Sequence, residues 1–210
     1  MTIQLAVLDI AGTTVQEHGL VYEALRAATG VEDVNDWLGS DKREAIHALI
    51  GPASEEEVER VHADFRRRLE AAYDRVPPEP FPGVPETIAR LRAKGVKVAL
   101  TTGFDRAITD GLLARIGWDD GTVDAVVCAD DVARGRPAPD MVYRAMELTG
   151  VGDPERVLVA GDTPNDLGAG ISAGAAVVVG VLTGGLSAEQ LGAHRHTHIL
   201  PGVAQLEQLT

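Results

Sequence analysis

Cysteine, lysine and long hydrophobic runs are scarce in this sequence. Its 210 residues include one cysteine, Cys128, which cannot form a disulfide within the chain, so we expect a reducing compartment. No uninterrupted apolar segment is long enough to cross a bilayer, and the first residues lack the basic-then-apolar layout of a signal peptide. We therefore expect a cytoplasmic protein. Lysine occurs only at Lys42, Lys94 and Lys97, which makes each lysine a candidate for a specific role.

Positive charge is also in deficit: 19 lysines and arginines face 32 acidic residues, for a net charge of −13. Such a surface repels phosphate backbones and anionic lipid headgroups, so we expect neither a nucleic-acid nor a membrane partner. The hydrophobic content of 45% supports one substantial core and a small second lobe. We expect the run Arg66-Arg67-Arg68 to be a solvated helix face that could also contact an acidic partner subunit in a homodimer.

Short apolar segments rich in β-branched residues alternate with helical patterns through most of the chain. We predict strands at 3–8, 96–100, 122–127, 157–160 and 176–181, and helices near 84–94, 105–116, 139–149 and 165–173. This alternation is typical of an α/β fold with a parallel sheet covered on both faces.

The segment after the first strand has a different pattern. We predict helices at 19–29, 41–49 and 54–75, followed by a break at the proline-rich segment 77–83. The chain is therefore expected to start the α/β core at 1–14, leave it for an all-helical cap at 15–81, and return to the core at 82–210.

Four polar clusters follow strands of the predicted sheet. They are Asp9, residues 101–103, residues 134–140 and residues 161–166. In an open parallel sheet, ligands bind outside the carboxyl ends of the strands, so we expect the four clusters to meet at one rim. Taken singly, each has an ordinary structural interpretation as a turn residue, a helix cap or a solvated loop cation.

Taken together, the clusters resemble the four motifs of the haloacid dehalogenase superfamily, in the same order. The segment Asp9-Ile10-Ala11-Gly12-Thr13-Thr14 resembles the nucleophile motif of that superfamily, Asp-x-Asp-Gly-Thr. The resemblance implies a Rossmann-like parallel-sheet core with a cap inserted after the first strand. It also implies that Asp9 attacks phosphorus and forms an aspartyl-phosphate.

The same resemblance implies a Mg²⁺ site and a phosphate site. Asp9, Asp162 and the backbone carbonyl of Ala11 would hold Mg²⁺, with Asp166 binding directly or through water. Clustered carboxylates repel one another strongly unless a cation lies among them, which agrees with this assignment. The phosphoryl group of a small phosphorylated or phosphonated metabolite would contact Gly12, Thr13, Thr102 (or, as an alternative, Thr101), Gly103 and Arg136.

Ala11 departs from the superfamily pattern, which has a second aspartate at this position. That aspartate protonates the leaving group, and general acid–base catalysis of this kind is worth about 10²–10⁴ in rate. Three explanations stay open. The protein is a phosphomonoesterase with another acid, such as one acting on phosphoglycolate; it is a phosphate-binding regulator without catalysis; or its leaving group needs no acid.

The third explanation has a parallel in the phosphonoacetaldehyde hydrolase (phosphonatase) family, which this chain resembles in having Asp-x-Ala-Gly-Thr-Thr. That family cleaves a carbon–phosphorus bond through a Schiff base on a lysine in its cap motif, Met-Gly-x-x-Lys. Here the cap has Leu38-Gly39-Ser40-Asp41-Lys42. A helix dipole and the adjacent Arg43 would lower the pKa of Lys42. The family's histidine three residues later is Ala45 in this chain.

The three alternate histidines His194, His196 and His198 would share one face if they lay on a strand. No carboxylate or cysteine lies near them in the sequence. We therefore interpret this segment as an ordinary surface or edge-strand segment and not as a metal site.

Overall fold

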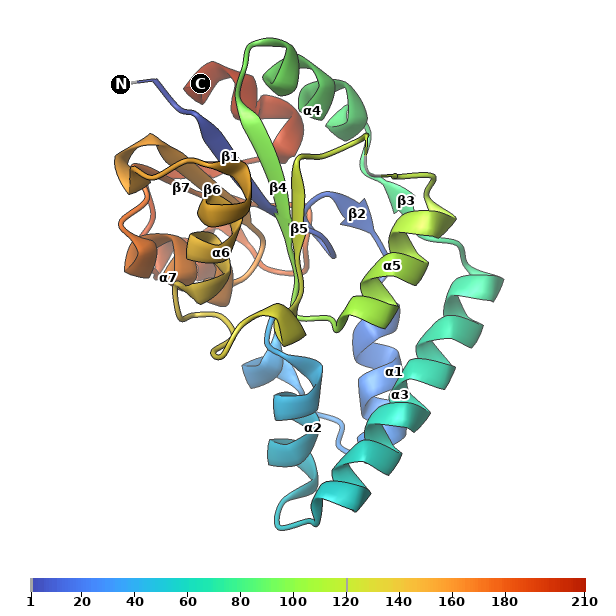
Figure 1. The fold of residues 1–210 in the computed structure, drawn as a ribbon. Coiled ribbons are helices and arrows are strands. Elements are labelled where there is room, and N and C mark those ends of the chain that lie inside the picture. The colour runs from blue at the N-terminus through green and yellow to red at the C-terminus, as the bar shows by residue number, and fades with distance from the viewer. Residues whose placement is uncertain (1, 120) are drawn as a thin grey trace.

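One six-stranded parallel sheet forms the centre of the molecule in the computed structural model, which describes residues 2–119 and 121–210 (Figure 1). The strands are β1 (Leu5–Asp9), β4 (Lys97–Thr101), β5 (Ala125–Val127), β6 (Val157–Gly161), β7 (Val177–Val181) and β8 (His198–Leu200). Their order is β5-β4-β1-β6-β7-β8. The direction of winding therefore reverses between β1 and β6, and the crevice at such a reversal is where open α/β sheets bind ligands.

Strand β1 is completely buried because its side chains pack on both faces of the sheet. Leu5 and Val7 belong to the apolar cluster under helices α6 (Asp140–Thr149) and α7 (Pro164–Ala173). Ala6 and Leu8 face the opposite cluster, which includes helix α4 (Val84–Ala93). The prediction of a parallel sheet covered on both faces is confirmed.

The remaining core elements lie around this sheet. They are helix α5 (Arg106–Arg115), helix α8 (Ala188–Gly192) and the 3₁₀ segments η2 (Ala129–Asp131), η3 (Pro154–Arg156) and η4 (Val203–Leu209). The sequence patterns did not predict α8 or η4, whereas the segment that we interpreted as a surface or edge strand leads into β8, at the edge of the sheet. Only His198 of the three alternate histidines lies on a strand, and His194 and His196 precede it in an exposed loop.

The insert after β1 consists of helices α1 (Leu20–Thr29), α2 (Lys42–Ile50) and α3 (Glu55–Arg75), with the short 3₁₀ segment η1 (Asn35–Trp37). Asp41 caps α2 by accepting the Glu44 N–H at 2.7 Å, which agrees with the predicted helix start. At the two ends of the insert, β2 (Val15–Gln16) and β3 (Glu79–Pro80) pair as an antiparallel ribbon that we did not predict. The exact limits of the cap stay a prediction.

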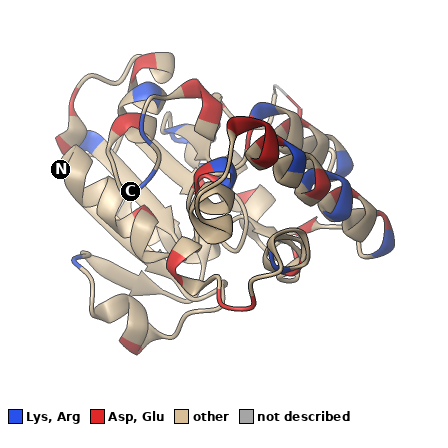
Figure 2. Cartoon of the chain, turned by 90° about the horizontal axis from the view of Figure 1, so that it is seen from below, with Lys and Arg blue, Asp and Glu red and all other residues tan. Residues whose placement is uncertain are grey.

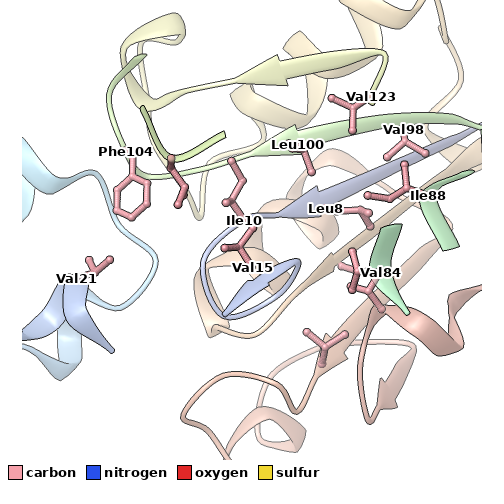
Figure 3. Close-up of a cluster of buried hydrophobic side chains, with 14 of the residues drawn as sticks. Leu8, Ile10, Val15, Val21, Val84, Ile88, Val98, Leu100, Phe104 and Val123 are labelled. Carbon is pink, nitrogen blue, oxygen red and sulfur yellow. The ribbon is translucent and has the colours of Figure 1, made fainter. Parts of the chain in front are cut away.

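Apolar side chains connect the sheet to the cap without a break (Figure 3). Leu8 and Leu100 lie within the sheet, Phe104 follows β4, and Val21 belongs to α1 of the cap. Charged residues of both signs gather on the helices, whereas the strands carry few of them (Figure 2). Among the described residues, no helix is both long and apolar enough to cross a bilayer.

Candidate active site

Three buried carboxylates meet at the carboxyl ends of β1 and β6. Asp9 is the last residue of β1, Asp162 directly follows β6, and Asp166 lies in the first turn of α7. One carboxylate oxygen from each residue lies within 4.8 Å of the others. The sheet topology therefore brings together residues that are far apart in the sequence, as the strand-end clusters predicted.

Arg136 reaches this cluster from the loop before α6. Its Nη1 donates to Asp9 at 2.6 Å and also to Asp166. The guanidinium is buried, and its Nε has no hydrogen-bond partner among the residues that the structure describes. A buried guanidinium with an unused donor is suited to a further anionic group, such as a phosphoryl oxygen.

The charge of the cluster is incompletely balanced. Burial, followed by the negative charge of Asp166, raises the pKa of Asp9 to about 7. Burial and the neighbouring Asp9 also raise the pKa of Asp162 well above its usual range. Three carboxylates share one guanidinium, and hard carboxylate oxygens are the ligands that Mg²⁺ prefers. Asp9, Asp162 and Asp166 therefore fit a divalent cation, and a ligand role for the Ala11 carbonyl stays a prediction.

The turn after Asp9 is packed tightly against Asp162. Gly12 has a φ of +87°, and a Cβ atom there would lie 2.5 Å from Oδ2 of Asp162, so only glycine fits. Its N–H donates to the Val15 carbonyl at 2.9 Å, and phosphate binding by Gly12 stays a prediction. The Thr13 hydroxyl donates to Asp162 at 2.9 Å. Phosphate binding by Thr13 stays a prediction.

Thr102 and Gly103 follow β4 and line the same small cavity as Asp9 and Arg136. The Thr102 hydroxyl accepts the N–H of Phe104 at 3.2 Å, which leaves its own proton free to donate. Thr101, the alternative, is the last residue of β4 and does not line this cavity.

Lys42 enters the same cavity from the cap. Its Nζ donates to the Ser40 carbonyl at 2.6 Å and lies 6.0 and 5.7 Å from the ring centroids of Tyr22 and Phe104. Burial, followed by the positive charge of Arg136, lowers the pKa of Lys42 to about 8. We expected Arg43 to contribute, but its side chain is half exposed and pairs with Glu55 at 2.7 Å. Burial is therefore the principal cause.

The cap closes on the core through a few polar contacts. Nδ2 of Asn165 donates to the Leu38 carbonyl at 2.8 Å and to the Ser40 hydroxyl at 3.1 Å. The Lys42 N–H donates to the Gly103 carbonyl at 3.2 Å. The small cavity between core and cap has a volume of about 20 Å³, enough for about one water molecule.

A larger cleft of about 390 Å³ adjoins this cavity, and Ala11, Tyr22 and Thr163 line both spaces. Sequence reasoning missed Tyr22, Phe104 and Asn165 as site residues. Asn165 lies within the polar cluster 161–166, so the position of that cluster after a strand could have indicated it as a site residue. Nothing in the spacing of Tyr22 distinguished it from other residues of its helix.

Comparisons with known proteins agree with this geometry. Residues 3–174 match the family model described as haloacid dehalogenase-like hydrolase. The chain is 34% identical to phosphonoacetaldehyde hydrolase of Bacteroides fragilis over 154 residues, 73% of this chain and only 57% of that protein. It is 30% identical to phosphonoacetaldehyde hydrolase of Bacillus cereus, over 91% of this chain and 81% of that protein.

Two solved structures share the fold. A phosphonoacetaldehyde hydrolase-like protein from Oleispira antarctica superposes with a TM-score of 0.83 at 23% identity, over 100% of this chain and 91% of that one. A putative phosphoglycolate phosphatase from Lactobacillus delbrueckii superposes with a TM-score of 0.80 at 22% identity, over 100% and 98% of the two chains.

Proposed function

Because this chain belongs to the haloacid dehalogenase-like hydrolases and resembles their phosphonoacetaldehyde hydrolases, we propose that it cleaves the carbon–phosphorus bond of a small carbonyl phosphonate. The substrate would be phosphonoacetaldehyde or a close α-phosphono carbonyl compound. The observation that carries the proposal is that Lys42 of the cap and Asp9 of the core line one closed cavity. A nucleophile for phosphorus and an amine for a carbonyl thus face the same space.

The surroundings of Lys42 support its use as a nucleophile. Its amine contacts a backbone carbonyl and two aromatic rings, and no carboxylate lies within ion-pair distance among the described residues. With a pKa of about 8, a useful fraction of the amine is neutral near neutral pH. Schiff-base formation requires the neutral amine.

The reaction proceeds in two covalent stages. The Lys42 amine adds to the carbonyl carbon, and the adduct takes up one proton from solvent and loses water to give an iminium. Asp9 then attacks phosphorus, the carbon–phosphorus bond breaks, and its electron pair moves into the iminium to give an enamine. Water hydrolyses the aspartyl-phosphate to phosphate and free Asp9. The enamine takes a proton on carbon, and hydrolysis of the resulting iminium releases the aldehyde and Lys42.

This scheme explains why Ala11 can replace an acid. The leaving electron pair is delocalised into the iminium, so no alkoxide needs a proton when the bond to phosphorus breaks. Arg136 and Thr102 would hold the phosphoryl oxygens by charge and hydrogen bonding, using the unused donors described above. Asp9, Asp162 and Asp166 would hold Mg²⁺, which when bound supplies the positive charge that lets an anionic carboxylate approach an anionic phosphoryl group.

Borohydride trapping tests the proposal. Incubation with phosphonoacetaldehyde and borohydride should attach the substrate carbon covalently to Lys42, as read by peptide mass spectrometry. Lys94→Ala and Lys97→Ala are matched controls, because these two other lysines are exposed surface residues and should not affect the label. Lys42→Ala should remove it.

Two outcomes would replace the proposal. Release of phosphate from monoesters such as phosphoglycolate, unchanged in Lys42→Ala, would establish a phosphomonoesterase. A chain that binds Mg²⁺ and phosphate but turns over neither class of substrate, and whose Asp9→Asn variant behaves as the parent protein, would be a phosphate-binding regulator.

A further inference from the structure

Imine formation needs a hydrogen-bond donor for the substrate's carbonyl oxygen, and the usual candidates are absent from this chain. The nucleophile motif has Ala11 in place of an acid, and Ala45 stands where the resembled family has a histidine. As the amine adds to the carbonyl carbon, the oxygen gains negative charge. A donor aimed at that oxygen typically accelerates such a step by about 10²–10³.

The lining of the closed cavity leaves one side chain for this task. Arg136 and Thr102 are committed to the phosphoryl group in the proposed reaction, and Lys42 is the nucleophile. The Thr163 hydroxyl already donates to Asp166 at 2.6 Å. Among the described residues that line the cavity, Tyr22 is the remaining side chain with a polar hydrogen to donate.

The Tyr22 hydroxyl is held with its proton available. It accepts the N–H of Gly39 at 3.3 Å, and no described residue accepts its own proton within hydrogen-bond distance. Gly39 is in turn pressed against the core, because a Cβ atom there would lie 2.5 Å from the Thr163 hydroxyl. The loop that positions Tyr22 is therefore fixed when the cap is closed.

The electrostatic surroundings keep this hydroxyl protonated. Burial, followed by the negative charges of Asp162, Glu17 and Asp9, raises the pKa of Tyr22 well above its ordinary value. The group therefore acts as a hydrogen-bond donor and not as a base. Tyr22 also lines the same cavity as Asp9, Lys42 and Arg136.

We propose that Tyr22 is a further catalytic residue, whose hydroxyl donates a hydrogen bond to the substrate's carbonyl oxygen while Lys42 attacks the carbonyl carbon. The inference rests on the proposed Schiff-base function. The carbon–nitrogen bond forms as the carbonyl π bond breaks, and one proton of the attacking nitrogen moves to the oxygen. The carbinolamine oxygen then takes a second proton from solvent and leaves as water, while the nitrogen lone pair forms the C=N bond of the iminium.

The position of Tyr22 between the two spaces also gives the substrate an orientation. Tyr22 lines both the closed cavity and the outer cleft of about 390 Å³, whereas Arg136 and Thr102 line only the closed cavity. Once the cap has opened to admit the substrate, the phosphonate would lie beside Arg136 and Thr102, and the carbonyl would lie at the boundary, between the Lys42 amine and the Tyr22 hydroxyl. Water lost from the carbinolamine can leave through the outer cleft.

Tyr22→Phe tests the inference, because it removes the hydroxyl and retains the ring beside Lys42. We expect the rate of borohydride trapping of phosphonoacetaldehyde at Lys42 to fall about 10²-fold. Alkylation of Lys42 by acrylonitrile, an electrophile without a carbonyl oxygen, should keep its rate. Tyr143→Phe is the control, because Tyr143 is 48% exposed on α6, away from the site.

The outcomes separate this inference from the function on which it rests. A parent protein that traps no carbonyl phosphonate at Lys42 overturns both. A parent that traps the substrate, with an equal rate in Tyr22→Phe, overturns the inference alone. Equal slowing of trapping and of acrylonitrile alkylation would show that Tyr22 merely positions Lys42, and this also contradicts the donor role.

Discussion

The core and the cap treat the charged groups that they bring to the active site in opposite ways. The core gives Asp9 one oppositely charged partner, since Arg136 donates to it directly, although burial and Asp166 still raise the pKa of Asp9. The cap gives the Lys42 ammonium a single backbone carbonyl and two aromatic rings. The core thus offsets part of the charge that it buries, whereas the cap buries a charge without an opposite one beside it.

The largest expected effect comes from a substitution that removes the nucleophile of the core and leaves the cap lysine unchanged. Asp9→Asn keeps the shape of the side chain but removes the nucleophile, so phosphate release should fall by about 10⁴–10⁶. Trapping of the aldehyde on Lys42 should persist, because the amine belongs to the cap. Phosphate assay and mass spectrometry on the same samples measure both. Asp110→Asn, at an exposed position of α5, should leave both unchanged. Loss of trapping in Asp9→Asn would show that the two stages are not separable.

The pH dependence of aldehyde trapping on Lys42 tests the lowered pKa of this cap residue. Since burial lowers the pKa of Lys42 to about 8, the trapping rate should fall about tenfold per pH unit below that value and level off above it. Initial rates with cyanoborohydride between about pH 6 and 11 give the profile. A rate that keeps rising to about pH 10.5, as for an ordinary lysine, would contradict the account of the buried amine.

Stability should reveal the cost of that burial. The folded-state pKa of Lys42 lies below its unfolded value of 10.5, so the folded protein binds fewer protons between about pH 8 and 10.5 and becomes more stable as pH rises through that window. Below about pH 8 the amine is protonated in the folded protein, and the full free-energy cost of burying its charge is present. Lys42→Met should therefore raise the free energy of unfolding near pH 7 by about 1–3 kcal/mol, measured by urea denaturation. A lower stability of this variant would mean that the amine makes a favourable native interaction.

The smallest expected effect concerns the contact between the two parts. Asn165→Ala removes two hydrogen bonds from the core to the cap loop, each worth about 1 kcal/mol, and should raise KM several-fold and lower Tm by a few degrees. Ser54→Ala is a useful contrast, since it removes the N-terminal hydrogen bond of α3, which does not involve the core. It should lower Tm and leave KM unchanged. An unchanged KM in Asn165→Ala would show that Asn165 serves folding and not closure.

The sequence predicted the site residues that lie at or just after the carboxyl ends of strands. Each of the segments containing Asp9, Thr102 and Asp162 follows a short apolar strand, and parallel topology brings such ends together whatever the loops do. The cap lysine was identified by its motif, but the physical reason for its lowered pKa was not. Burial depends on how the cap docks, which local spacing does not encode.

Features that depend on packing between distant segments could not be predicted. Tyr22 lines the cavity of the site because of how α1 packs against the core, and its neighbours Val21, Ala24 and Leu25 give only an ordinary apolar stripe. The Thr13 hydroxyl donates to Asp162, a partner 149 residues away. Strand β8 is three residues long and only partly buried, too short for periodicity to reveal, and it forms only because β7 offers an edge.

The ribbon at the base of the cap has a consequence for how such enzymes can diversify. Val15 pairs with Pro80, Gln16 pairs with Glu79, and the Phe81 N–H donates to the Thr14 carbonyl at 3.0 Å. The chain therefore leaves and rejoins the core at one place. Recombination could exchange the insert beyond this ribbon without interrupting any strand of the main sheet, provided that the new insert matched the apolar and polar contacts that the core makes with the cap.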